Sequence, residues 1–354
     1  MGSRGREPEE GVAELLERSA EHFEGGRFEE ALAAAEAAAA LAPREVVAHH
    51  YRGAALTELD RLDDAVEAYE RALKLDPDDP DTLLSMADLF VSRLGDEREI
   101  FERGLELARR GAKAARKGGD EALEAELLLL EGVAHNQLGN SREALARIDA
   151  ALPLLGPDVD ALVERGTALF ELCRFEEARR QFEQVVKEAQ EPWAHHYLGL
   201  IAERAGDAKA AERHQAKARK LAPDEFPARV RLSHEEFDAA VEDALAELPE
   251  KVRAYLGNVA IAAEEIPAQD DLTASDPPLS PQILGVFRGS PWRDKGIMDP
   301  WAHFPSSIVL YQANLERFAI DREDLIEQIG ITLIHEVGHF LGFDEDDLRE
   351  RGLE

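Results

Sequence analysis

The sequence holds a single cysteine, Cys173, among its 354 residues. One thiol cannot form an intramolecular disulfide, so a disulfide-stapled fold is excluded, and a reducing compartment fits this composition. We interpret Cys173 as a small buried apolar residue, which is the usual environment of a free cysteine.

Basic residues are also scarce. The chain has 41 Lys and Arg against 74 Asp and Glu, which gives a formal net charge of −33. A protein that binds DNA or RNA needs a basic face to displace the counterions of the phosphates, and an anionic membrane attracts basic segments. We therefore expect neither nucleic acid nor a membrane among the partners of this protein.

Long apolar runs are missing as well. No segment approaches the roughly 18 apolar residues that a membrane span requires. The first residues, MGSRGREPEEGVAELLERS, lack the apolar core of a secretory signal peptide. We expect a cytoplasmic protein in which residues 1–11 form a disordered N-terminus.

A repeated pattern fills the first two thirds of the sequence. Five segments align, and their first residues lie 34 apart (26 to 60), 34 apart (139 to 173) and 33 apart (173 to 206). A small residue precedes each segment by the same offset, at Ser19, Gly53, Gly132, Gly166 and Gly199. Prolines end three of the units at the same phase, at Pro43, Pro77 and Pro223.

This period is typical of a repeated helix pair. The small residue lets the first helix approach the second, and the proline stops the second helix because it cannot continue the hydrogen-bond ladder. One pair cannot bury its apolar face alone, so successive pairs stack into a solenoid. Between Ala87 and Gly132 the equivalent small positions are 45 residues apart, which predicts a degenerate third unit with longer helices.

Residues 12–223 resemble the tetratricopeptide repeat, and we expect about six helix pairs there. The resemblance implies a solenoid that binds a protein or peptide, as a substrate or a partner. A rigid spacer or a dimerisation surface is the alternative. The paired Lys and Asn side chains by which some relatives grip a peptide carboxylate are not matched, because His50 and Ala54 stand at the corresponding place in the second repeat.

The periodicity changes after Pro223, and we expect a connector at 224–233 followed by a second domain at 234–354. Ser233 and Glu236 form the pattern of a helix capping box, and Pro249 begins a further short helix. Runs at 258–266, 283–289 and 306–312 then alternate or cluster apolar residues as short strands do. A long helix is predicted from Asp321 to Leu341, ending at Gly342.

The end of that helix carries HEVGH, with His335 and His339 four residues apart. This spacing puts both imidazoles on one helix face, so both can reach one zinc ion. Glu336 is rotated about 100° from His335. It is therefore free to act as a general base on metal-activated water instead of serving as a ligand.

Two histidines leave the metal one protein ligand short. Gly342 lets the chain reverse after the helix, and Glu345 follows three residues later, where it can return as the third ligand. The neighbouring acids Asp344, Asp346 and Asp347 compete for that role and remain open alternatives.

Residues 234–348 resemble the minimal-zincin family of bacterial metallopeptidase-like proteins. The matching segments are Leu245 to Pro249, Asn258-Val259, LGVFRG at 284–289, IVLYQ at 308–312 and HEVGHFLGFDEDDL at 335–348. The resemblance implies a small α+β domain in which a reduced sheet packs on the active-site helix. It also implies one zinc per chain on His335, His339 and an acid at position 345, where the family more often has Asp.

Two further side chains are candidates for contacts with a substrate. Tyr311 could polarise a scissile carbonyl or simply pack as a strand residue. Arg288 could bind a substrate carboxylate or pair with one of the many acids of the chain.

The sequence thus predicts an α-helical solenoid followed by a small α+β zincin-like domain. The first hypothesis for its function is a zinc-dependent metallopeptidase that hydrolyses peptide bonds, with the solenoid recruiting a substrate or partner protein. The alternative is a non-catalytic scaffold or regulator whose zincin-like domain binds metal or peptide without hydrolysis. A third hypothesis is a site occupied by another divalent ion.

Overall fold

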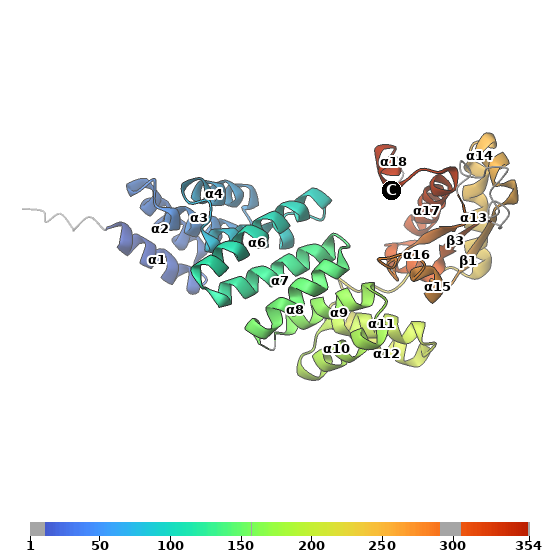
Figure 1. Cartoon of the computed structure of the whole chain (residues 1–354), viewed down its shortest axis with the longest axis horizontal. Helices are drawn as coiled ribbons and strands as arrows, with labels where there is room; N and C mark the ends of the chain where they lie inside the picture. The colour runs from blue at the N-terminus through green and yellow to red at the C-terminus, as the bar shows by residue number, and fades with distance from the viewer. Residues whose placement is uncertain (1–10, 157, 291–305, 353–354) are drawn as a thin grey trace, which may run out of the picture. The chain divides into compact units, whose positions relative to one another are not determined.

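The computed structural model describes residues 11–156, 158–290 and 306–352. The chain divides into two compact units, Met1–Leu169 and Phe170–Glu354 (Figure 1). The disorder predicted for residues 1–11 falls, apart from Gly11, outside the described residues.

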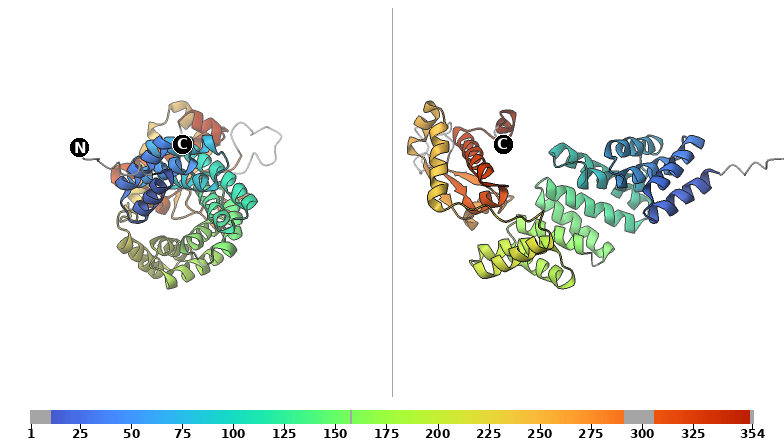
Figure 2. Two further views of the ribbon diagram at one scale, coloured as in Figure 1. Left: turned by 90° about the vertical axis from the view of Figure 1, so that its left-hand side faces the viewer. Right: turned by 180° about the vertical axis from the view of Figure 1, so that it is seen from behind.

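The first unit is built from helix pairs that follow one another along the chain (Figures 1 and 2). From α1 to α8, each helix packs against the next, as α1 against α2 and α7 against α8. Gly53 explains the close approach within one pair, since a Cβ there would lie 2.6 Å from the Tyr69 ring. The helices are α1 (Val12–Glu24), α2 (Phe28–Leu41), α3 (Val46–Glu58), α4 (Leu62–Leu75), α5 (Pro80–Ser92), α6 (Arg98–Gly118), α7 (Glu121–Gln137), α8 (Ser141–Leu155) and α9 (Val159–Glu171), which crosses into the second unit.

The predicted degenerate third unit is the pair α5 and α6. Helix α6 has 21 residues and ends at Gly119, whose φ of 80° is left-handed. Two glycines let this long helix pack closely, because a Cβ at Gly104 would meet Val91 and a Cβ at Gly111 would meet Leu127. The longer spacing in the sequence is therefore accommodated by extra helical turns.

The second unit begins with the last repeats and continues into a domain with a small sheet. Ser233 caps α13 and forms the predicted capping box with Glu236. No helix among the described residues of either unit has a stretch long and apolar enough to traverse a bilayer. The helices are α10 (Phe175–Glu188), α11 (Pro192–Arg204), α12 (Ala208–Leu221), α13 (His234–Glu247), α14 (Glu250–Tyr255), η1 (Leu256–Asn258), α15 (Gln269–Leu272), α16 (Gln312–Phe318), α17 (Arg322–Leu341) and α18 (Glu345–Glu350).

The sheet has the strand order β1-β3-β2, with β1 (Ala260–Glu264), β2 (Gly285–Arg288) and β3 (Ser307–Tyr311). β1 runs parallel to β3 and β2 runs antiparallel to it. The three strands predicted from the sequence are confirmed, each one or more residues shorter at its ends. Helix α17 packs against β2 and β3, and α13 packs against α17.

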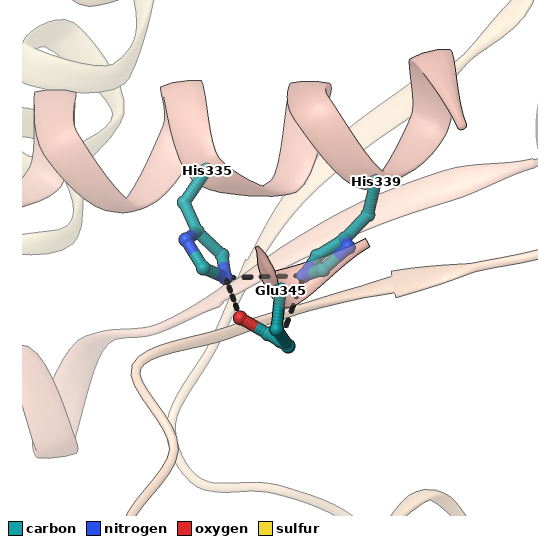
Figure 3. Close-up of side chains that lie close together, drawn as sticks. All are labelled: His335, His339 and Glu345. Carbon is teal, nitrogen blue, oxygen red and sulfur yellow. Dashed lines mark hydrogen bonds and ion pairs between the residues drawn. The ribbon is translucent and has the colours of Figure 1, made fainter. Parts of the chain in front are cut away.

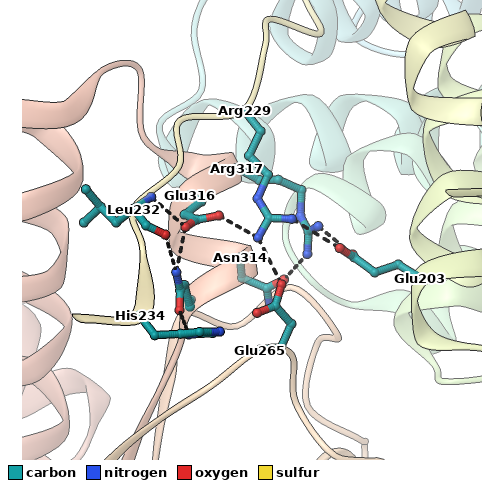
Figure 4. Close-up of polar contacts among 9 residues, drawn as sticks. Glu203, Arg229, Leu232, His234, Glu265, Asn314, Glu316 and Arg317 are labelled. Atoms are coloured by element: carbon teal, nitrogen blue, oxygen red, sulfur yellow. Dashed lines mark hydrogen bonds and ion pairs between the residues drawn. The ribbon is translucent and has the colours of Figure 1, made fainter. Parts of the chain in front are cut away.

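A network of charged side chains joins the last repeats to the sheet domain inside the second unit (Figure 4). Arg317 of α16 donates to the Glu203 carboxylate of α11 at 2.6 Å. Arg229, from the segment after the repeats, contacts Glu203 at 3.2 Å and the buried Glu316 at 2.7 Å. The last repeat pair is therefore bonded directly to the helix that follows β3.

Candidate metal centre

Helix α17 provides the two histidines. Its N-cap Asp321 accepts hydrogen bonds from the backbone N–H groups of Glu323 and Asp324. Its C-cap Gly342 has a φ of 92°, a left-handed conformation that reverses the chain immediately after the helix. His335 and His339 therefore lie one turn apart on the last turns of a well-defined helix.

The donor atoms of three side chains converge (Figure 3). His335 Nε2 and His339 Nε2 are 3.1 Å apart. Glu345 Oε1 lies 3.2 Å from His339 Nε2, and Glu345 Oε2 lies 3.8 Å from His335 Nε2. Among the described residues, His335, His339 and Glu345 form the group whose donor atoms all lie within 4.8 Å of one another, the arrangement that could hold a metal ion.

Of the acids after Gly342, the structure brings Glu345 to the histidines. Asp344 instead caps the short helix α18 by accepting from the Asp347 backbone at 2.8 Å. Asp346 is exposed and pairs with Arg349 at 3.0 Å. Of the acids that the sequence offers as a third ligand, Glu345 is therefore the one that this geometry favours.

Residues outside the ligand set hold it in place. The Nδ1 of His339 lies 3.1 Å from the Phe343 carbonyl oxygen, which makes Nδ1 the donor and leaves the Nε2 lone pair for a metal. Leu348 is fully buried, and a Cβ at Gly338 would lie 2.4 Å from its Cδ2. Gly338 therefore admits α18 against α17, and α18 carries Glu345.

Glu336 lies on the side of α17 that faces β2. Its side chain is 6 % exposed and accepts a hydrogen bond from the backbone of Phe287. Burial raises the pKa of its carboxyl group, while the nearby histidines lower it. A Cβ at Gly285 would lie 3.0 Å from Glu336 Cγ, so β2 can approach Glu336 this closely only with glycine at that position.

A cavity of about 1030 Å³ opens beside this centre. Its described lining includes His335, Glu336, His339 and Glu345, so the metal donors and the buried carboxylate face one shared space. Strand β2 contributes the opposite wall through Gly285, Val286 and Phe287.

Tyr311 and Arg288 are not brought to the histidines. Gly285 pairs with Leu310 and Phe287 with Ile308 on the sheet face that α17 covers, so their strand neighbours Arg288 and Tyr311 face the other way. There Arg288 pairs with Glu264 at 2.9 Å and with Asp271, and the Tyr311 hydroxyl lies 3.5 Å from Asp271. A substrate contact by either side chain stays a prediction that this geometry does not favour.

Comparison with known families fits this geometry. Residues 256–353 match the family model of zincin-like metallopeptidases. Residues 46–79 and 163–226 match models of the tetratricopeptide repeat. The chain joins tetratricopeptide repeats to a zincin-like metallopeptidase domain. No curated protein sequence matches the chain.

Solved structures support the repeat part of the fold. The crystal structure of PilW, a type IV pilus biogenesis factor, is 18 % identical with a TM-score of 0.52, over 60 % of this chain and 94 % of that one. A Pseudomonas aeruginosa PilF structure is 16 % identical with a TM-score of 0.51, over 64 % of this chain and 96 % of that one. Likeness at this level shows the tetratricopeptide-repeat fold alone.

The donor set of the zincin-like domain also fits zinc. Two imidazoles and one carboxylate are a donor set found in catalytic zinc sites that keep a fourth position open. Donors about 2.0–2.1 Å from a tetrahedral ion lie roughly 3.4 Å from one another. The three separations of 3.1, 3.2 and 3.8 Å bracket that value.

Proposed function

We propose that the zincin-like domain is a zinc-dependent peptidase, in which His335, His339 and Glu345 hold the metal and Glu336 is the general base. The observation that carries this proposal is the convergence of three donor atoms on a large cavity that Glu336 also lines. Structural zinc sites use four protein ligands, whereas three ligands beside a cavity are typical of catalysis.

Bound zinc would supply Lewis-acid chemistry, by polarising a carbonyl oxygen and making water acidic near neutral pH. Glu336 would accept a proton from the attacking water and pass it to the leaving amine. The Phe287 backbone bond orients the Glu336 carboxylate for this task. Burial disfavours the charged carboxylate, which helps it to bind a proton transiently.

The substrate would lie along β2. This strand pairs only with β3 among the described strands, so its second edge is available for an extended segment. Main-chain hydrogen bonds of this kind fix an extended peptide without regard to its sequence. The tetratricopeptide repeats would recruit the protein that presents the segment, because such repeats expose extended binding surfaces.

The test is Glu336→Gln in the full chain. We expect about one zinc per chain in both proteins by elemental analysis, and a loss of casein hydrolysis of roughly 10²–10⁴-fold in the variant. His339→Ala is the matched control and should lose the zinc. A wild-type protein that takes up no zinc on titration would refute the proposal. Bound zinc with no cleavage of any protein would favour a non-catalytic scaffold.

A further inference from the structure

The cavity has two chemically different halves. The metal donors and Asp344 gather at one end, after the last turns of α17. Ile331 stands one turn before His335 on the same helix stripe, and from there the described lining is mainly apolar. The apolar half is formed by Leu279, Ile283, Leu284, Phe318 and Ile331.

Phe318 is unusual for a residue at such a position. It ends α16, lines the cavity and is 59 % exposed. An apolar ligand in the cavity would cover this ring, and covering it would remove apolar area from water.

The segment that carries Ile283 is held in place by hydrogen bonds. The side-chain amide of Asn314 donates to the carbonyl oxygens of Pro281 at 3.1 Å and Ile283 at 2.7 Å. Gln282 between them donates to Glu171 of α9 at 3.0 Å. These bonds fix the backbone that carries Ile283 and Leu284, so little ordering entropy is lost when a ligand fills the apolar half.

The apolar half of the cavity suits an apolar side chain of a ligand. The five residues that form this half are apolar, and the side-chain amide of Gln328, which also lines the cavity near Ile331, donates to Asp324 at 3.2 Å. A charged side chain would lose its hydration there, because the described lining of this half offers no group of opposite charge. An aliphatic or aromatic side chain would bury its surface together with that of Phe318 and Ile331.

We propose that this half-cavity is the specificity pocket of the domain and that it selects peptide segments with a large aliphatic or aromatic residue next to the bond held at the metal centre. This inference rests on the proposed function, because the metal end of the cavity sets where the peptide bond lies. It adds the substrate class, which the metal-binding residues do not determine.

The experiment is a binding series that does not need hydrolysis. Acetyl-capped dipeptide hydroxamates that differ only in one side chain (Leu, Phe, Ser or Asp) are titrated calorimetrically into the zinc-loaded full chain. The hydroxamate group anchors each probe to the metal. We expect the Leu and Phe probes to bind at least about tenfold more tightly than the Ser probe, and the Asp probe to bind weakest.

Variants of two lining residues test whether the preference for Leu over Ser depends on the apolar half of the cavity. Phe318→Ser and Ile331→Ser should reduce the Leu-to-Ser ratio to a few-fold while zinc content stays unchanged. Ile334→Ser is the matched control, because Ile334 is 37 % exposed on the same helix outside the described lining and should leave the ratio intact. Phe318 is exposed enough for its replacement to leave the fold intact.

The outcomes separate the two proposals. Equal affinity for all four probes, or tightest binding of the Asp probe, overturns the pocket assignment and leaves the metal centre standing. Binding of none of the probes to a zinc-loaded chain means that the metal has no open position. That result defeats the proposed function and the pocket together.

Discussion

At the scale of the residue, Gly285 controls the distance between β2 and the buried carboxylate. A Cβ there would stand 2.8 Å from Thr332 Cγ2 and 3.0 Å from Glu336 Cγ. Helix or strand must then shift by a fraction of an ångström, and Glu336 shifts with them. The HExxH motif alone says nothing about this constraint, although a glycine inside a strand is a known sign of close approach.

We therefore expect Gly285→Ala to reduce turnover by roughly 10–100-fold, since small misplacements of a catalytic group have effects of this size. Zinc content should not change, because the three ligands are untouched. Gly257→Ala is the control, as a Cβ there meets nothing within 4 Å. Unchanged turnover in the Gly285 variant would show that Glu336 tolerates displacement.

His196 of α11 makes the second unit sensitive to acid. Its ring packs on Phe226 with centroids 5.0 Å apart. Burial lowers the pKa of His196 to about 4, and the nearby Arg317 adds to the effect. The unfolded chain then binds a proton below its ordinary value of 6.5 while the folded chain stays neutral, so the free energy of unfolding falls as pH falls from 6.5 towards 4.

Between pH 7 and pH 5 this group should cost about 2 kcal/mol of stability. The glutamine in His196→Gln cannot titrate. Between pH 7 and pH 5, the free energy of unfolding measured by urea denaturation should therefore fall by about 2 kcal/mol less in the variant than in the wild type. If the free energy of unfolding fell equally in the wild type and the variant, groups other than His196 would cause the acid sensitivity.

At the scale of the element, α18 positions Glu345, the proposed third ligand. It has six residues, and Leu348 anchors it against Gly338 between the two histidines. Leu348→Ala removes that anchor without touching a donor atom. We expect zinc affinity to fall by about tenfold or more, as happens when groups that orient ligands are changed. Competition with a chelator measures this, and the exposed Glu350→Ala is the control.

The same scale shows what sequence reasoning can reach. The capping residues Asp321 and Gly342 predicted the two ends of α17. The spacing of four residues between His335 and His339 predicted that both histidines lie on one face of the helix. The sequence predicted Glu345 as the third ligand and left its acidic neighbours open, because the packing of Leu348 that brings Glu345 towards the histidines is a contact in space. Tyr311 and Arg288 illustrate the same limit: alternation along a strand says which residues share a face, but not which face the helix covers.

At the scale of the whole molecule, the two compact units are defined by contacts in space, whereas the connector expected at 224–233 is defined by a change of sequence pattern. The second unit starts at Phe170 and includes the last repeats. Contacts between the last repeats and the sheet domain, among them the pairing of Glu203 with Arg229 and Arg317, are not visible in the repeat pattern.

This division predicts that a 224–354 fragment is much less stable than a 159–354 fragment. Removing Glu203 leaves the half-buried Arg317 without its carboxylate, and uncovers apolar surface as well. Thermal and urea unfolding of the two fragments should differ by more than about 3 kcal/mol. Equal stabilities would mean that the last repeats are dispensable for the sheet domain.

The short sequence separation of the proposed metal ligands affects how much zinc stabilises the folded state. The three proposed ligands lie within eleven consecutive residues, 335–345. Closing so short a loop around an ion costs little chain entropy, so the unfolded polypeptide also retains measurable affinity for zinc. A ligand that binds both states stabilises the native one only by the difference between the two affinities. Chelation should therefore lower the melting temperature less than it would for an equally tight site assembled from distant parts of the chain.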